Sequence, residues 1–314
     1  PTVPGESPQI WRATPVDDGW LTEPLTSGEP HQTQLATKSL TRTGTRIMNL
    51  RGTWSEGTIE WFSETEPADA HPLIVIDDET FGRTPARWSG DGRLILYRDA
   101  MGRIHRVDAD TGVTGLVVDD GRSHDDPNAW SAPEFDGERV LATVVDDTGI
   151  AIHRESDDGL WTPLATLEVP QDSSLRYYGS PEALVVGGRS YLSVAVKNQP
   201  NHGDATPTDS EIWIIGIEPG ADGAPQFARR CDDGAPGLFR SDPETFIGSD
   251  EVFVYYNLID LEGGSDGRSY QAWRARTGIP SGVPAPEVTV ETGTLRGFVD
   301  GGTHAFRGIP YAAA

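Results

Sequence analysis

The sequence repeats a unit of about fifty residues, and this repeat constrains the fold more than any other feature. Four segments begin at a proline, pass through a turn with Gly or Asp, and end in an apolar stretch. Their prolines are Pro85, Pro133, Pro181 and Pro243, so the segments start 48, 48 and 62 residues apart. A weaker copy covers residues 43–62. Hairpin-forming segments at this period are typical of a β-propeller, in which each repeat forms one four-stranded blade.

We therefore predict that residues 1–284 form an all-β domain, a β-propeller of five, or alternatively six, four-stranded blades. The 36 glycines and 24 prolines fit a fold with many turns, and no helix-length apolar periodicity occurs in this part. Residues 9–26 resemble the second half of a repeat, as seen at 152–164. Residues 1–30 are thus predicted to be a half blade. It either closes the ring with the last copy or remains from a sixth blade.

Charge and cysteine content exclude several function classes. The net charge is −24, so nucleic acid and anionic membrane surfaces are poor partners. Cys231 is the single cysteine, which excludes an intrachain disulfide and a thiolate metal cluster. No apolar run reaches the roughly 18 residues of a membrane span, and no nucleotide-binding fingerprint occurs. We expect no cofactor and no metal. The compartment stays open, with a secreted or periplasmic location favoured.

The last thirty residues depart from the repeat. They read V-T-V-E-T-G-T-L-R-G at 288–297 and, after a variable turn, F-R-G-I-P-Y-A at 306–312. This pattern resembles the opening hairpin of type-B carboxylesterases, which are α/β hydrolases. The resemblance implies that residues 285–314 are the truncated start of a carboxylesterase domain, and that the parent protein hydrolyses esters by Ser-His-acid chemistry. No G-x-S-x-G nucleophile elbow occurs, so no residue here receives an esterase catalytic role. We expect a fragment that lacks its C-terminal catalytic domain.

Three of the repeated segments read Pro-Glu, which places Glu134, Glu182 and Glu244 at one position of the repeat. These segments resemble blades of five-bladed glycoside hydrolases, which hold acidic residues on their innermost strands. An inverting glycosidase needs two carboxyl groups roughly 6.5–9.5 Å apart. A recurring Glu favours a structural role, because a catalytic acid and its base need different environments. The residue before the proline is Ala132, Ser180 or Asp242 in these three segments. Asp242 is the single acidic residue at this position, and it is the better catalytic candidate.

Two further segments, residues 124–126 and 176–178, each occur once in the sequence. Both are predicted to lie in loops or strand starts on the ligand-binding face. The alternative is purely structural: an Asp turn before a strand for the first, and an aromatic strand start for the second. The candidate ligand-binding residues are His124, Asp125, Asp126, Arg176, Tyr177 and Tyr178.

Three functions stay open at this point. The first is the N-terminal propeller of a carboxylesterase, with a substrate-gating or ligand-binding role and with an ester as the small-molecule partner. The second is a glycoside hydrolase-like or sugar-binding propeller, whose partner is a carbohydrate. The third is a protein-interaction scaffold, because propellers often only bind.

Overall fold

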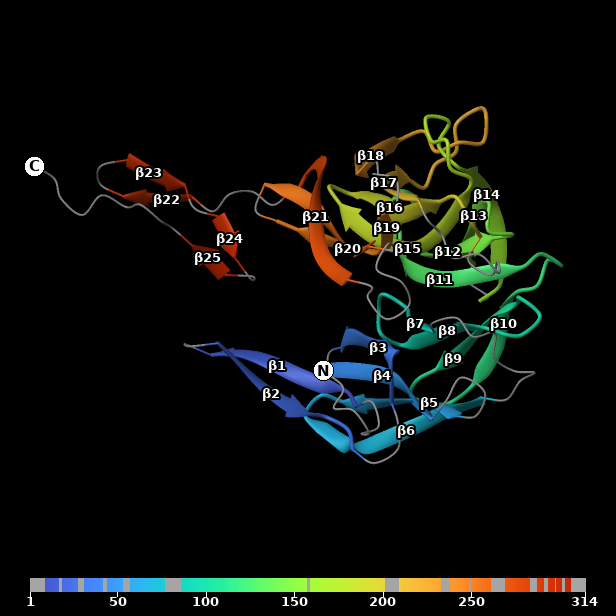
Figure 1. The fold of residues 1–314 in the computed structure, drawn as a ribbon, viewed down its shortest axis with the longest axis vertical. Helices are drawn as coiled ribbons and strands as arrows, with labels where there is room; N and C mark the ends of the chain where they lie inside the picture. Colours follow the sequence, from blue (N-terminus) through green and yellow to red (C-terminus); the bar gives the residue numbers. More distant parts are fainter. Residues whose placement is uncertain are drawn as a thin grey trace, which may run out of the picture. The chain divides into compact units, whose positions relative to one another are not determined.

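The computed structural model is built almost entirely of antiparallel β-strands (Figure 1). Within the described residues, the one helical element is a short 3-10 turn, η1 (Pro133–Phe135), and no helix there is long and apolar enough to span a membrane. The structure describes residues 9–16, 19–27, 31–41, 44–52, 57–76, 86–156, 159–200, 209–232, 238–248, 250–260, 269–282, 287–290, 293–296, 298–300 and 303–305.

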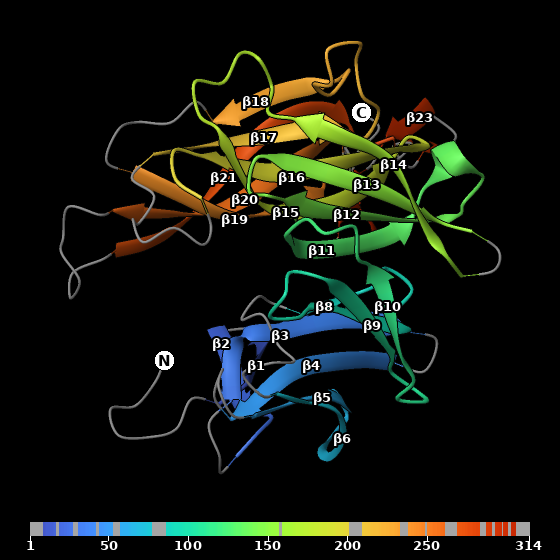
Figure 2. The same cartoon turned by 90° about the vertical axis from the view of Figure 1, so that its right-hand side faces the viewer.

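The chain forms two compact units. The first comprises residues 1–131 and 138–166, and the second comprises residues 132–137 and 167–314. In both units the strands of a sheet follow one another in chain order, as β3 to β6 illustrate in Figure 2. Each hairpin therefore joins neighbours, which is the arrangement that the repeat predicts.

The first unit holds one two-stranded hairpin and three four-stranded sheets. The hairpin β1–β2 falls where a half blade is predicted, and the sheets fall on the first three repeats. The strands are β1 (Trp11–Val16) and β2 (Gly19–Pro24); β3 (His31–Thr41), β4 (Gly44–Gly52), β5 (Gly57–Ser63) and β6 (Glu66–Ile76); β7 (Arg87–Trp88), β8 (Leu94–Arg98), β9 (Ile104–Asp108) and β10 (Thr114–Val118); β11 (His124–Ser131), β12 (Arg139–Val145), β13 (Gly149–Glu155) and β14 (Trp161–Glu168).

The second unit holds a four-stranded sheet, a three-stranded sheet and two short hairpins. The last repeat thus has three strands among the described residues, where four were predicted. The strands are β15 (Tyr177–Val186), β16 (Arg189–Lys197), β17 (Ser210–Gly216) and β18 (Ala228–Asp232); β19 (Leu238–Ile247), β20 (Glu251–Asp260) and β21 (Ser269–Pro280); β22 (Glu287–Val290) and β23 (Gly293–Arg296); β24 (Phe298–Asp300) and β25 (Thr303–Ala305).

Consecutive sheets pack face to face within each unit. On β8, Ile95 and Tyr97 enter a core shared with the β3–β6 sheet, whereas Leu96 enters a core shared with the β11–β14 sheet. Side chains alternate between the two faces of a strand, and here both faces are buried, so β8 reads as a continuous apolar run. Trp61 and Trp88 belong to the first of these cores. These two tryptophans therefore pack between the sheets.

The first strands of three successive sheets share a bulge that contains a proline. In β11, β15 and β19 the register shifts between Asp125 and Asn128, Gly179 and Glu182, and Ser241 and Glu244. Each of these strands lies at the edge of its sheet, where a proline removes no ladder hydrogen bond. The residue before each proline has a positive φ: Asp126 (45°), Ser180 (49°) and Asp242 (51°).

The bulges correct one part of the predicted repeat. Pro181 and Pro243 are equivalent, as predicted, but their counterpart in the β11–β14 sheet is Pro127. Pro133 instead starts η1, in the connection between β11 and β12. The prediction from the Pro-Glu motif was wrong at Pro133 because a proline is equally suited to an edge-strand bulge and to the first turn of a helix. Pro85 lies outside the described residues.

Candidate functional site

Asp242 occupies the bulge of β19, in the left-handed backbone region that few residues other than glycine adopt. Its carboxylate accepts hydrogen bonds from Ser241 Oγ (2.9 Å) and Asn257 Nδ2 (3.2 Å). Both donors are neutral, and the side chain is exposed. Bulges re-aim side chains and are frequent beside active sites. Asp242 is thus an exposed carboxylate in a fixed position.

The three glutamates do not share one position. Glu182 and Glu244 occupy equivalent positions, because each directly follows the proline of its bulge. They lie opposite Ser193 and Tyr255, respectively. The prediction that Glu134 is their equivalent is wrong, because Glu134 lies in η1. Its carboxylate accepts hydrogen bonds from the backbone N–H of Ser190 and from Ser190 Oγ (2.8 Å). Glu134 therefore holds the start of β16.

His124 is fully buried at the start of β11 and has partners on both ring nitrogens. Nε2 lies 2.9 Å from Asp120 Oδ1, and Nδ1 lies 2.8 Å from Thr143 Oγ1. A carboxylate, an imidazole and a hydroxyl in this order are the parts of an activated nucleophile. Thr143, however, has no exposed surface, so its hydroxyl cannot meet a substrate. The arrangement stabilises the β11–β12 pair.

Asp125 and Asp126 are also buried, in the bulge of β11. The carboxylate of Asp125 accepts a hydrogen bond from the backbone N–H of Asp126 (2.8 Å), which holds the left-handed turn. These two residues were predicted to face a ligand. Burial and this local bond assign them instead to the strand itself.

The segment from Arg176 to Tyr178 leads into β15. The backbone N–H of Arg176 bonds to Lys197 O (3.1 Å), while its side chain is exposed and Tyr177 is half-buried. Tyr178 is fully buried, and its hydroxyl donates to Glu168 O (2.9 Å). Burial raises the pKa of this phenol well above its ordinary value. Tyr178 is an anchor in the core, contrary to its predicted role in ligand binding.

A cleft of about 240 Å³ in the second unit was not predicted. Its wall carries an edge-to-face aromatic pair, Tyr191 and Phe227, with ring centroids 5.5 Å apart. Phe227 is 39% exposed, which leaves ring surface open to the cleft. The lining residues are Glu134, Arg189, Ser190, Tyr191, Gly216, Ile217, Glu218, Gln226 and Phe227.

Backbone hydrogen bonds fix the cleft, because its residues come from two paired strands and the connection between β17 and β18. Tyr191 pairs with Gly216 in the β16–β17 ladder. The N–H of Gly216 donates to Phe227 O (2.8 Å), and the N–H of Gln226 donates to Glu218 O (2.9 Å). Arg189, Glu218 and Gln226 are exposed, so their polar groups are open to a ligand.

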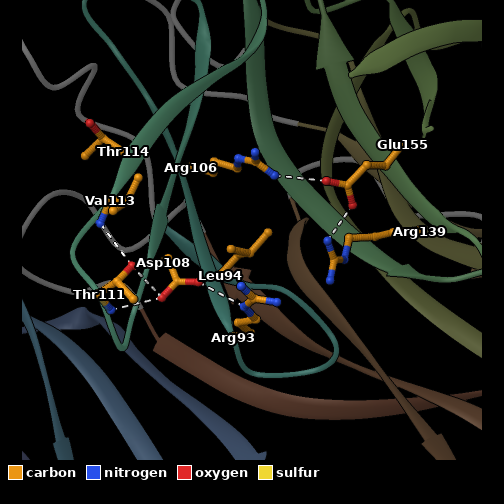
Figure 3. Close-up of a pocket in the computed structure, with 9 residues that line it drawn as sticks. All are labelled: Arg93, Leu94, Arg106, Asp108, Thr111, Val113, Thr114, Arg139 and Glu155. Atoms are coloured by element: carbon orange, nitrogen blue, oxygen red, sulfur yellow. Dashed lines mark hydrogen bonds and ion pairs between the residues drawn. The ribbon is translucent and has the colours of Figure 1, made fainter. Parts of the chain in front are cut away.

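A second cleft, of about 390 Å³, lies in the first unit and is rich in arginine (Figure 3). Arg106 and Arg139 converge on Glu155: Arg106 Nη1 lies 2.9 Å from Glu155 Oε1, and Arg139 Nη1 donates to Oε2. Arg93 Nε donates to Asp108 Oδ2 (2.9 Å). The lining residues are Arg93, Leu94, Arg106, Asp108, Thr111, Val113, Thr114, Arg139 and Glu155.

The described residues include no group of three or more His, Cys, Asp or Glu side chains that could hold a metal ion. Cys231 is partly buried against the core of the second unit. Burial raises the pKa of its thiol to about 11, so the thiolate is disfavoured at neutral pH.

No protein-family description matches the sequence, and no curated protein matches it. Several solved structures partly superpose. An oligogalacturonate lyase from Vibrio parahaemolyticus is 12% identical over 93% of this chain and 78% of its own, with a TM-score of 0.45. A sucrose-6-phosphate hydrolase from Lactobacillus gasseri is 12% identical over 83% of this chain and 60% of its own, with a TM-score of 0.44. A periplasmic gluconolactonase from Pseudomonas aeruginosa is 14% identical over 78% of this chain and 70% of its own, also with a TM-score of 0.44. Likeness at this level assigns neither substrate nor site.

Proposed function

We propose that this chain is a propeller-type domain that binds carbohydrate in the cleft formed by Tyr191 and Phe227. The observation that carries the proposal is an exposed aromatic ring beside exposed polar side chains in one fixed hollow. A sugar ring has apolar C–H faces and a rim of hydroxyls, so it suits an aromatic wall with hydrogen-bonding groups around it. Binding sites commonly combine an apolar wall with a few convergent polar groups that set orientation.

The polar groups of the cleft match the rim of a sugar. Glu218 can accept hydrogen bonds from hydroxyls, Arg189 can donate them, and the amide of Gln226 can do both. Glu134 already binds Ser190 through both carboxylate oxygens, so it shapes the cleft more than it reads the ligand. The volume of about 240 Å³ lies just below the roughly 300–1,000 Å³ of sites for drug-sized ligands. One sugar ring is the expected occupant.

Substitution of Phe227 by alanine is expected to weaken carbohydrate binding at least tenfold, about 1.4 kcal/mol. The ligand would be selected on a glycan array and its affinity measured by isothermal titration calorimetry. Phe246→Ala is the matched control, because Phe246 is also exposed and also packs edge-to-face, against Tyr255, outside the cleft. Equal losses in both variants, or no glycan bound by the wild type, would contradict the proposal.

Hydrolysis of a glycoside is a second candidate function, and it is favoured by Asp242 on β19, which does not line the aromatic cleft. Asp242 is exposed, is fixed by a bulge and has neutral hydrogen-bond donors, so its carboxylate is free to act on a ligand. If the domain cleaves glycosides, Asp242→Asn should abolish turnover and leave the thermal midpoint within a few degrees of wild type. Turnover would be followed as reducing ends released from the glycan selected on the array. Unchanged turnover in Asp242→Asn would exclude this role.

The C-terminal hairpin supports a further proposal, that the parent polypeptide continues into a carboxylesterase domain. Strands β22 and β23 pair Val288 with Leu295 and Val290 with Gly293, and this hairpin hydrogen-bonds to no other described strand. Such a hairpin is what the resemblance implies for this segment. The F-R-G-I-P-Y-A motif lies outside the described residues. Hydrolysis of short-chain aryl esters by the full open reading frame, and not by this chain, is the expected result.

A further inference from the structure

We propose that the arginine-rich cleft of the first unit binds a small ligand carrying a single carboxylate on a hydroxylated skeleton, such as a uronate sugar. This site is separate from the aromatic cleft and does not rest on the function proposed for it. It is formed by the start of β8, by β9 and the turn after it, and by the paired strands β12 and β13 (Figure 3).

Charge is the first argument. The cleft is lined by three guanidinium groups and two carboxylates, and Arg139 also pairs with Asp91, so these side chains balance in charge within a chain whose net charge is −24. A hollow whose charges balance repels anions less than the rest of a negative molecule does. A monoanion can therefore enter, whereas Asp91, Asp108 and Glu155 would repel a more highly charged ligand.

Free hydrogen-bond donors are the second argument. A guanidinium carries five N–H donors in a planar fork that matches a carboxylate. Among the described residues, Arg93 bonds only through Nε, to Asp108, and Arg106 only through Nη1, to Glu155. The outer edge of Arg93, whose side chain is 67% exposed, is therefore open to a ligand.

Glu155 shows how a carboxylate is held in this cleft. One of its oxygens receives Arg106 and the other receives Arg139, so an internal carboxylate already bridges two guanidinium groups (Figure 3). A ligand carboxylate would bind in the same way to the remaining edges of Arg93 and Arg106. The exposed Val113 offers an apolar contact, and Thr114 offers a hydroxyl to the skeleton of the ligand.

The test is calorimetric titration of the chain with sodium D-glucuronate, methyl glucoside and inorganic phosphate. Saturable binding of glucuronate is expected, weaker at high salt because charge attraction is screened. Methyl glucoside, which lacks the charge, should bind this site at least tenfold more weakly. Phosphate binding as tight as that of glucuronate would overturn the assignment to a carboxylate, and no binding of glucuronate would overturn the site.

Variants locate the binding. Arg93→Gln should weaken glucuronate binding about tenfold, which is typical of one lost charge-assisted hydrogen bond. Arg122→Gln is the matched control, because Arg122 is an exposed arginine of the same unit, is paired with Asp146 and lies outside the cleft. Phe227→Ala should leave this binding unchanged, which separates it from the aromatic cleft. Equal affinities for wild type and Arg93→Gln, with circular dichroism confirming both folds, would contradict the proposal.

Discussion

Replacing Arg240 with leucine is expected to lower the free energy of unfolding by about 3–5 kcal/mol, the cost of breaking a buried ion pair by removing one partner. The side chain of Arg240 is 5% exposed, and its Nε donates to Asp232 Oδ2 (2.8 Å). Its Nη1 also donates to Leu238 O (3.0 Å), at the start of β19. Loss of the guanidinium breaks the ion pair with Asp232 and removes the donor to Leu238 O. Urea denaturation followed by circular dichroism would measure the change.

An exposed ion pair provides the comparison. Arg122→Leu removes the partner of Asp146, and both side chains are more than 40% exposed, so a loss of at most about 1 kcal/mol is expected. The double variant Arg240→Leu with Asp232→Leu should be more stable than Arg240→Leu alone, because the carboxylate whose ion pair with Arg240 is broken is then removed as well. Equal losses at Arg240 and Arg122 would mean that the Arg240 pair is not a buried one.

Acidification is expected to destabilise the protein between pH 6.5 and about 4 through His153. Burial, and then the neighbouring His124 ring, lower the pKa of His153 from 6.5 to about 4, and Asp120 opposes this only in part. In that window the unfolded chain binds a proton that the folded chain does not. The free energy of unfolding therefore falls as the pH falls, by up to about 3 kcal/mol, with no further loss from this group below pH 4.

The variant His153→Gln, which does not titrate, should flatten this part of the stability profile. His71→Gln is the control, because His71 is exposed and stacks on Trp61, and its profile should keep the wild-type slope. Denaturation midpoints at closely spaced pH values would show the difference between the two variants. A slope in His153→Gln as steep as in the wild type would assign the pH dependence to other groups.

The sheets could be predicted because their signals are local. Short apolar runs such as β8 and β12, with glycine turns between the strands, specify hairpins wherever the neighbours in sequence are also neighbours in space. The position of Pro133 could not be predicted, since the same Pro-Glu pair suits a strand bulge and a 3-10 turn. The β19–β21 sheet, with three strands among the described residues, also differs from the four predicted.

The clefts could not be predicted, for a different reason. Tyr191 and Phe227 are 36 residues apart and meet only because the β16–β17 ladder and the connection before β18 bring them together. Arg93 and Glu155 reach one hollow only through the packing of two sheets. His124 and Tyr178 show the converse case. Their residue types suggested ligand contacts, but buried hydrogen bonds to Thr143 and Glu168 account for them.

A crystal structure of the chain with the glycan selected on the array tests most directly whether a sugar ring binds against Phe227. We expect electron density for one ring over the exposed face of Phe227, with its hydroxyls within hydrogen-bonding distance of Glu218, Gln226 or Arg189. Density for the glycan at another place, with the Tyr191–Phe227 cleft empty, would contradict the account.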